Sequence, residues 1–269
     1  MIVERMQYYV FPTTQVNPAG TVQEGLVLRT DPEAAFRLYG IAIWTNDVQG
    51  GAFDGQMSLR FHRPDGRLVQ RLFTAANAVA PGNQYADSPT PTGANPNQAL
   101  VSPVYPNILF PANSVVVLDI ETLNSATRNP SAVIVFVGTK LFKDGDIWAP
   151  QYPAKFKARP YLNNLFVPNV TISSGPVLNQ PFNVEKDADF VFQLGGYADT
   201  SAATGGFPDS LADLGFIMRD WQGKAYSNDY VPIALLFPFL TAQIPGFVYP
   251  EIYIPRDQQL LFDFKYLWS

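Results

Sequence analysis

Hydrophobic and polar residues alternate with a period of two over much of the chain. In the stretch 114–123, for example, Val116, Leu118 and Ile120 occupy every second position. Successive side chains of a β-strand point to opposite faces, so this spacing predicts a strand with one apolar face. Helical spacing is missing almost everywhere, and the pattern therefore predicts an all-β protein.

Turn-forming residues separate the alternating runs. The chain contains 24 prolines and 19 glycines, and clusters such as Pro64-Asp65-Gly66 and Trp221-Gln222-Gly223 lie between runs. These residue types favour tight turns. We expect about eight strands in the first half, near residues 7–12, 21–30, 34–45, 56–62, 67–74, 104–110, 114–123 and 132–142. Many short strands with regular turns are typical of a β-sandwich or jelly roll.

One segment of the chain occurs twice. Residues 104–123 recur as residues 248–267, 144 positions later and without a gap. Seven of the 20 pairs are identical, at Val104/Val248, Tyr105/Tyr249, Pro106/Pro250, Ile108/Ile252, Pro111/Pro255, Asp119/Asp263 and Leu123/Leu267. Two weaker blocks recur in the same order at spacings of 156 and 157, the latter placing Gly66 on Gly223.

The repeat predicts two tandem jelly-roll (β-sandwich) domains that arose by internal duplication. We expect the first domain over residues 1–143 and the second over residues 161–269. The segment 144–160 between them is rich in proline and charge, as linkers between domains usually are.

The spacing of the repeat falls from 157 to 144 because the connection 75–103 is longer in the first copy. Loops of this length are uncommon without a function. We expect this loop to order against a neighbouring subunit. The candidate contact residues are Ser88, Pro89, Pro91, Asn95, Pro96 and Asn97.

Composition narrows the classes of partner. Hydrophobic residues make up 47% of the chain and charged residues only 15%, against roughly 25% charged residues in ordinary soluble domains. We therefore expect apolar surface to face a partner or another domain. The net charge of −5 is spread evenly, which argues against direct sequence-specific binding of nucleic acid. Prolines interrupt the uncharged tracts, so we expect no membrane span, and Glu4 and Arg5 argue against a secretion signal.

Residues that commonly carry chemistry are few. There is no cysteine and one histidine, His62, on a predicted strand just before a turn. We expect His62 to face solvent and the protein not to be an enzyme. Carboxylates crowd at Glu185, Asp187 and Asp189, but the twelve-residue calcium-loop pattern is missing. We therefore expect neither a metal nor a cofactor.

Two surface features remain open to more than one interpretation. The arginines at 60, 63, 67 and 71 fit ordinary hairpin solvation or a salt bridge between subunits better than a phosphate site. Trp221, at a turn beside Asp220 and Gln222, is a candidate glycan contact, although packing of an aromatic residue at a turn is commoner.

Several stretches of the chain resemble a known class of proteins. They are "FRLYGIAIW", the "RPDGR" turn, "VYPNILFPANSVVVLDIETLN" and the closing "VIVFVGTKLF". The pattern resembles the jelly-roll structural proteins of bacteriophage virions and is similar in plan to double jelly-roll major capsid proteins. That resemblance implies a homotrimer, a larger shell, contacts with other virion proteins, and a location in the virion after synthesis in the host cytoplasm.

Alternative functions follow from the same pattern. A capsid-decorating or tail protein of a phage would share the sandwich plan. A tandem carbohydrate-binding β-sandwich module, with Trp221 as the platform, is the alternative from another class, and an enzyme ranks third.

The second copy has no counterpart of the strand expected at 133–142. A sandwich without one strand exposes unpaired backbone groups, and such an edge attracts another segment. We expect an open edge along 258–268 that is covered by residues 1–10, by the linker near 156–162, or by a neighbouring subunit.

His62 provides a simple test of the non-enzymatic prediction. Replacing His62 with Gln should change the free energy of unfolding by no more than about 0.5 kcal/mol in urea titrations, as for ordinary surface residues. A hydrolase or transferase activity that disappears with this one substitution would contradict the prediction.

Overall fold

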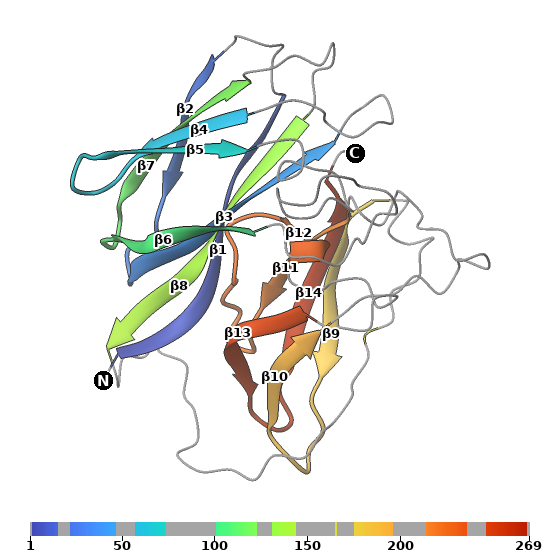
Figure 1. Cartoon of the computed structure of the whole chain (residues 1–269). Helices are drawn as coiled ribbons and strands as arrows, with labels where there is room; N and C mark the ends of the chain where they lie inside the picture. Colours follow the sequence, from blue (N-terminus) through green and yellow to red (C-terminus); the bar gives the residue numbers. More distant parts are fainter. Residues whose placement is uncertain are drawn as a thin grey trace.

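The computed structural model describes residues 2–15, 22–46, 57–73, 101–122, 131–143, 165, 175–195, 214–235 and 246–267 (Figure 1). The regular structure of these residues is β-strand throughout, apart from one short 3-10 turn, η1 (Ile233–Leu235). The all-β prediction is confirmed.

Eight strands form the first half of the chain, and all eight were predicted. They are β1 (Ile2–Gln15), β2 (Val22–Arg29), β3 (Ala35–Asn46), β4 (Met57–His62), β5 (Leu68–Phe73), β6 (Val101–Phe110), β7 (Val115–Thr122) and β8 (Ser131–Lys143). β1 begins earlier than expected because its first residues pair with the end of β8, from Ile2 opposite Lys143.

The eight strands make two antiparallel sheets with the orders β1-β8-β3-β6 and β2-β7-β4-β5. A cluster of buried side chains lies between the sheets, and we call it the first core. It contains the predicted apolar face of β7, with Val116, Leu118 and Ile120 each at most 1% exposed. Edge-to-face aromatic contacts also join strands of one sheet within this core, as between Tyr9 of β1 and Phe36 of β3, whose ring centroids are 4.7 Å apart.

Six strands form the described part of the second half. They are β9 (Val177–Asn183), β10 (Phe190–Gly195), β11 (Leu214–Arg219), β12 (Val231–Pro232), β13 (Gly246–Ile254) and β14 (Gln259–Tyr266). Their sheet orders are β12-β11-β14-β9 and β10-β13. At the spacings of the sequence repeat, β11, β14, β9, β10 and β13 correspond to β4, β7, β2, β3 and β6, and β12 lies beside β11 as β5 lies beside β4. Among the described residues, the β10–β13 sheet has no neighbours equivalent to β8 and β1.

The hairpin turns of the two halves also match. Gly66 and Gly223 both have a φ of +79°, a conformation that glycine adopts without a steric cost. The N–H of Gly66 donates to Arg63 O at 2.9 Å, and the N–H of Gly223 donates to Asp220 O at the same distance, 2.9 Å. The sequence repeat therefore reflects a repeated local structure.

The repeated aspartates hold a bulge in each half. The strand register shifts between Gln23 and Leu26 in β2, and Gly25 N donates to Asp119 Oδ1 at 3.1 Å. The equivalent bond in β9 runs from Asn179 N to Asp263 Oδ1 at 2.7 Å. Asp263 is 3% exposed and also forms an ion pair with Arg219. The carboxylate supplies an acceptor that this site needs, because the extra residue of a bulge leaves its N–H without a ladder partner.

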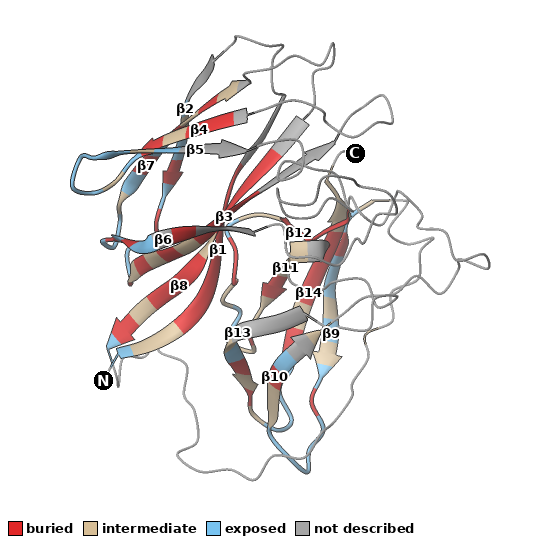
Figure 2. Ribbon diagram, in the orientation of Figure 1, coloured by how far each residue is buried: buried red, intermediate tan, exposed pale blue. Residues whose placement is uncertain are grey.

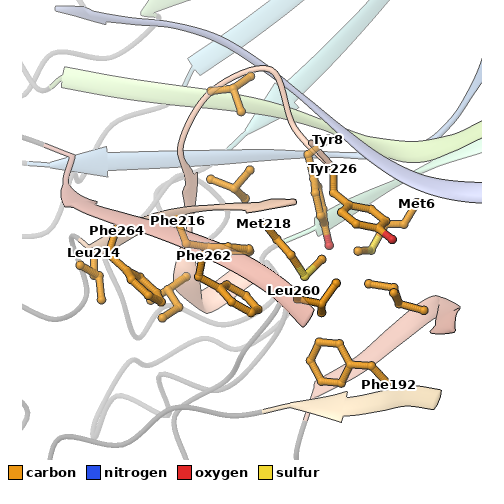
Figure 3. Close-up of a cluster of buried hydrophobic side chains, with 14 of the residues drawn as sticks. Met6, Tyr8, Phe192, Leu214, Phe216, Met218, Tyr226, Leu260, Phe262 and Phe264 are labelled. Atoms are coloured by element: carbon orange, nitrogen blue, oxygen red, sulfur yellow. The ribbon is translucent and has the colours of Figure 1, made fainter. Parts of the chain in front are cut away.

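A second cluster of buried side chains joins the two halves, and we call it the shared core (Figures 2 and 3). Most of its members belong to β9–β14, but six belong to the first half, namely Met6, Tyr8, Val10, Ala42, Val133 and Val135. Neighbouring residues of the same strands, such as Tyr9, Ile41 and Ile134, lie in the first core. β1, β3 and β8 are therefore buried on both faces.

One expectation about the second half is wrong. β14 is not an open edge, because β11 pairs with one side of it and β9 with the other. The N-terminal strand β1 does contact the second half. It does so with side chains in the shared core and with backbone groups along its free edge, not by pairing with β14. The segment 144–160 lies outside the described residues, and the division into domains stays a prediction.

The two bulge aspartates should differ in importance. Asp263→Ala should lower the free energy of unfolding by about 2–3 kcal/mol, because it leaves a backbone donor and Arg219 without their buried acceptor. Asp119→Ala should cost only about 1 kcal/mol, since Asp119 is half-exposed. Urea unfolding of both variants measures the difference, and equal losses would contradict this account of the second bulge.

Candidate functional site

The second half covers the free edge of β1. The N–H of Tyr8 donates to Tyr226 O at 2.8 Å, and Tyr8 forms a parallel bridge with Ser227. Asn228 then binds both backbone groups of Val10, accepting from its N–H at 2.6 Å and donating to its carbonyl at 2.9 Å. An edge strand normally leaves such groups unpaired. Residues 226–228 satisfy them and fix the position of the two halves.

A buried ion pair lies beside this edge. Arg5 Nη2 is 3.1 Å from Asp220 Oδ2, and the two side chains are 6% and 9% exposed. Arg5 also donates to Lys224 O at 3.1 Å, and its guanidinium lies 4.4 Å from the ring centroid of Tyr226. Three kinds of contact therefore compensate for removing the Arg5 charge from water.

The hairpin after β11 holds Asp220 ready for Arg5. Asp220 Oδ1 accepts from the N–H groups of Gln222 at 2.9 Å and Lys224 at 2.8 Å, which leaves Oδ2 for the guanidinium. An aspartate that bonds to the backbone two residues ahead is a common feature of tight turns. The local sequence around the turn thus fixes one side of the contact between the halves.

Two further charged clusters occupy the end of the β1–β8 pair. The buried Lys140 forms ion pairs with Asp31 and, at 2.8 Å, with Glu33. The Tyr9 hydroxyl donates to Asp31 Oδ2 and accepts from Asp31 N, both at 2.9 Å. Each of these charged side chains has a partner of opposite sign, an arrangement that suits a structural role.

The second cluster is centred on Glu4. Arg37 donates to Glu4 Oε1 at 2.6 Å, and Thr139 donates to Glu4 Oε2 at 2.9 Å. The Tyr39 hydroxyl also donates to Oε2, and burial raises the pKa of Tyr39. The carboxylate thus joins β1 to both β3 and β8.

Burial changes the titration of groups at the junction. It raises the pKa of Tyr8 and of Tyr9 well above the usual value of 10.0. It lowers the pKa of Lys224, and the nearby Arg5 charge lowers it further. The shifts of Tyr8 and Lys224 follow from the contact between the halves, whereas that of Tyr9 follows from burial in the first core.

The predicted site residues do not come together. His62 is exposed at the end of β4, as predicted, with Nδ1 3.4 Å from Gly66 O. Trp221 is half-buried and packs against the shared core. The loop residues Ser88, Pro89, Pro91, Asn95, Pro96 and Asn97 lie outside the described part of the chain.

The acidic turns of the second half border a shallow, open hollow of about 750 Å³. It is lined by Asn183, Val184, Glu185, Lys186, Asp257, Gln258 and Gln259. Nearby, Asp189 accepts from the Tyr253 hydroxyl at 2.7 Å and from Arg256 N at 2.9 Å, and the Arg256 N–H bond is the main cause of its lowered pKa. Within the described ranges, no three histidine, aspartate or glutamate residues are grouped closely enough to hold a metal ion.

Sequence reasoning missed the junction itself. The turn at Trp221-Gln222-Gly223 was recognised, but nothing in the alternation of residues indicates that Asp220 pairs with Arg5. The opening run "MQYYVF" carries a weak indication, because Met6 to Phe11 is apolar at nearly every position. Such a run is typical of a strand that is buried on both faces.

No protein-family model matches the sequence, and no curated protein matches it. Among solved structures, a single-residue variant of oxalate decarboxylase from B. subtilis is similar over 96% of this chain and 76% of that chain, with 10% sequence identity and a TM-score of 0.17. A similarity this low assigns neither a fold nor an activity. In the part of the chain that is described, no helix is long and apolar enough to cross a membrane.

The buried ion pair should be a major determinant of stability. Asp220→Ala should lower the free energy of unfolding by about 3–5 kcal/mol, because the Arg5 charge stays buried without its partner. Asp187→Ala is the matched control on an exposed turn and should change the free energy by about 0.5 kcal/mol or less. Equal effects of the two substitutions in urea unfolding would contradict the importance of the pair.

The buried tyrosines predict a loss of stability at alkaline pH. Above pH 10.0 the unfolded chain releases the phenolic protons, whereas the folded protein keeps those of Tyr8 and Tyr9. The stabilisation is therefore complete below pH 10.0 and is lost as the pH rises, by about 1.4 kcal/mol per pH unit for each tyrosine.

Tyr8→Phe tests this relation, because phenylalanine has no proton to release. The free energy of unfolding, measured in urea between pH 8 and 11, should fall with rising pH above pH 10.0. The fall should be less steep in Tyr8→Phe than in the wild type, by about one proton. An unchanged slope would mean that Tyr8 titrates alike in the folded and unfolded chain.

Proposed function

We propose that the chain is a virion structural protein of a bacteriophage, built on the plan of a double jelly-roll capsid protein, and that it forms a shell through contacts between copies. The observation that carries the proposal is the strand order of the first half. Sheets ordered β1-β8-β3-β6 and β2-β7-β4-β5 correspond to the two sheets of an eight-stranded jelly roll.

The second half supports the finer proposal of two tandem jelly rolls. Six described strands repeat the order of six strands in the first half, with matching turns and a matching bulge. The proposed domains are residues 1–143 and 161–269, joined by 144–160. The assignment to phages rests on the sequence resemblance alone.

The junction between the halves favours a structural role. The shared core, the covered edge of β1 and the ion pair between Arg5 and Asp220 make one stiff unit. Such a unit suits a shell, because subunits that keep their shape hold a fixed geometry towards their neighbours. The proposal includes a homotrimer, larger shells and contacts with other virion proteins, with a capsid-decorating or tail role as the alternative within the same class.

Jelly rolls also occur in lectins and in cupins. This sequence has one histidine and no cysteine, which excludes a metal site made of several histidines. Trp221, the candidate glycan contact, packs against the shared core, and that contact provides a structural reason for its presence. We therefore propose neither an enzymatic nor a carbohydrate-binding activity.

Electron microscopy and light scattering of the purified protein test the proposal. Trimers and larger regular assemblies are expected. A strict monomer that binds glycans on an array, with the signal lost in Trp221→Ala and kept in Trp221→Phe, would overturn it. Circular dichroism of both variants shows whether each has folded.

A further inference from the structure

Exposed aliphatic side chains form a stripe on the outer face of the β2-β7-β4-β5 sheet. Val27, Val115 and Val117 are 52%, 51% and 41% exposed, and Leu68 is 53% exposed. Val27 pairs with Val117 across β2 and β7. Leu68 lies opposite His62 on β4, which itself pairs with β7. We call these four residues the apolar stripe.

The apolar stripe has a basic rim. Arg29 lies opposite Val115 and is exposed, and Arg67 is exposed in the β4–β5 hairpin. Arg63 pairs with Asp65 at 3.6 Å in the same hairpin. Arg29, Arg63, Arg67 and Asp65 together carry a net charge of +2.

The turns at the far end of the second half have the opposite sign. Residues 183–189 and 255–259 contain Glu185, Asp187, Asp189 and Asp257 against Lys186 and Arg256. Four acids less two bases give a charge of −2. These turns border the open hollow, whose lining carries the acids Glu185 and Asp257 against one base, Lys186, which lies 3.7 Å from Asp257. The lining therefore has a net charge of −1, and its carboxylates can accept from a guanidinium group. We call this surface the acidic tip.

The corresponding face of the second half lacks the exposed aliphatic side chains of the apolar stripe at the equivalent positions. Pro181 pairs with Leu261 as Val27 pairs with Val117. Arg219, which corresponds to His62 at the repeat spacing of 157, pairs with the other side of Leu261. There Leu261 is half-buried, and Arg219 forms an ion pair with Asp263 on its own sheet. In the described residues, therefore, the exposed aliphatic row belongs to the first copy of the repeat.

We infer that the apolar stripe of one copy of this chain binds the acidic tip of a second copy. The apolar stripe exposes roughly 300 Å², which is the size of the largest apolar patch on a typical soluble monomer, and such patches are often functional. The opposite charges of the stripe's rim and the acidic tip select this pairing over stripe with stripe or tip with tip. The inference rests on the proposed function and specifies which surfaces build the assembly.

The arrangement of the two surfaces requires a second molecule. In Figure 1 the β4–β5 hairpin lies at the upper left of the molecule, and the β9–β10 and β13–β14 turns lie at the bottom. Contacts between two different surfaces are head-to-tail, and they close into a ring or continue into a larger assembly.

Sedimentation velocity of the full chain over a range of protein and salt concentrations tests the inference. We expect reversible association that weakens as salt is added, because exposed charges are screened. The double variant Val27→Thr, Val117→Thr should weaken association at least tenfold, and threonine keeps the strand propensity of valine. Lys143→Glu, an exposed charge reversal away from both surfaces, is the control and should associate like the wild type.

A charge swap tests the identity of the partner surface. Arg67→Glu and Asp187→Lys should each weaken association at least tenfold, and the combined variant should recover most of the loss. Circular dichroism melting of each variant confirms that it is folded.

Three results would overturn the inference. They are a wild type that stays monomeric at every concentration, stripe and tip variants that associate like the wild type, and a combined variant weaker than either single reversal. Regular particles that form equally well from the stripe variants would remove this inference but leave the proposed function standing. A monomeric wild type that forms no particles would remove both.

Discussion

The structure depends on one sheet that is buried on both faces. In β1, β3 and β8, one set of side chains fills the first core and the alternate set fills the shared core. Burying an aliphatic side chain stabilises a fold by roughly 1.5–3 kcal/mol, so the six residues contributed to the shared core form a large part of the contact. Neither half can move away without exposing them.

Polar contacts then fix how the two halves are positioned relative to each other across the shared core. Apolar packing alone tolerates some sliding, but the bonds from Tyr226 and Asn228 to the edge of β1 fix the register of the two halves. The ion pair between Arg5 and Asp220 is well matched because the hairpin after β11 presets the carboxylate. A misaligned junction would leave a charge buried without a partner, which is more costly than losing an apolar contact.

The sequence predicted the parts of the fold that depend on local pattern. All eight strands of the first half were found, because alternation such as that of Val116, Leu118 and Ile120 reports one buried face. The repeated Asp119 and Asp263 were visible as identities, and the structure explains them as partners of bulged N–H groups. The pairing of Arg5 with Asp220 could not be predicted, since it joins residues 215 positions apart and leaves no periodic trace. The prediction of an open edge at β14 was wrong. The sequence shows that a strand is missing from the second copy, but it does not show which of the remaining strands pair in space.

The central claim is that the two halves share one core and therefore unfold together. Native-state amide exchange of Val135→Ala tests it most directly, because Val135 is fully buried in the shared core but belongs to the first half. The substitution should lower the free energy of opening measured by amide exchange by about 2 kcal/mol. The decrease should be the same in β14 as in β1. Wild-type protection in β14, with losses confined to β1, β3 and β8, would contradict the claim.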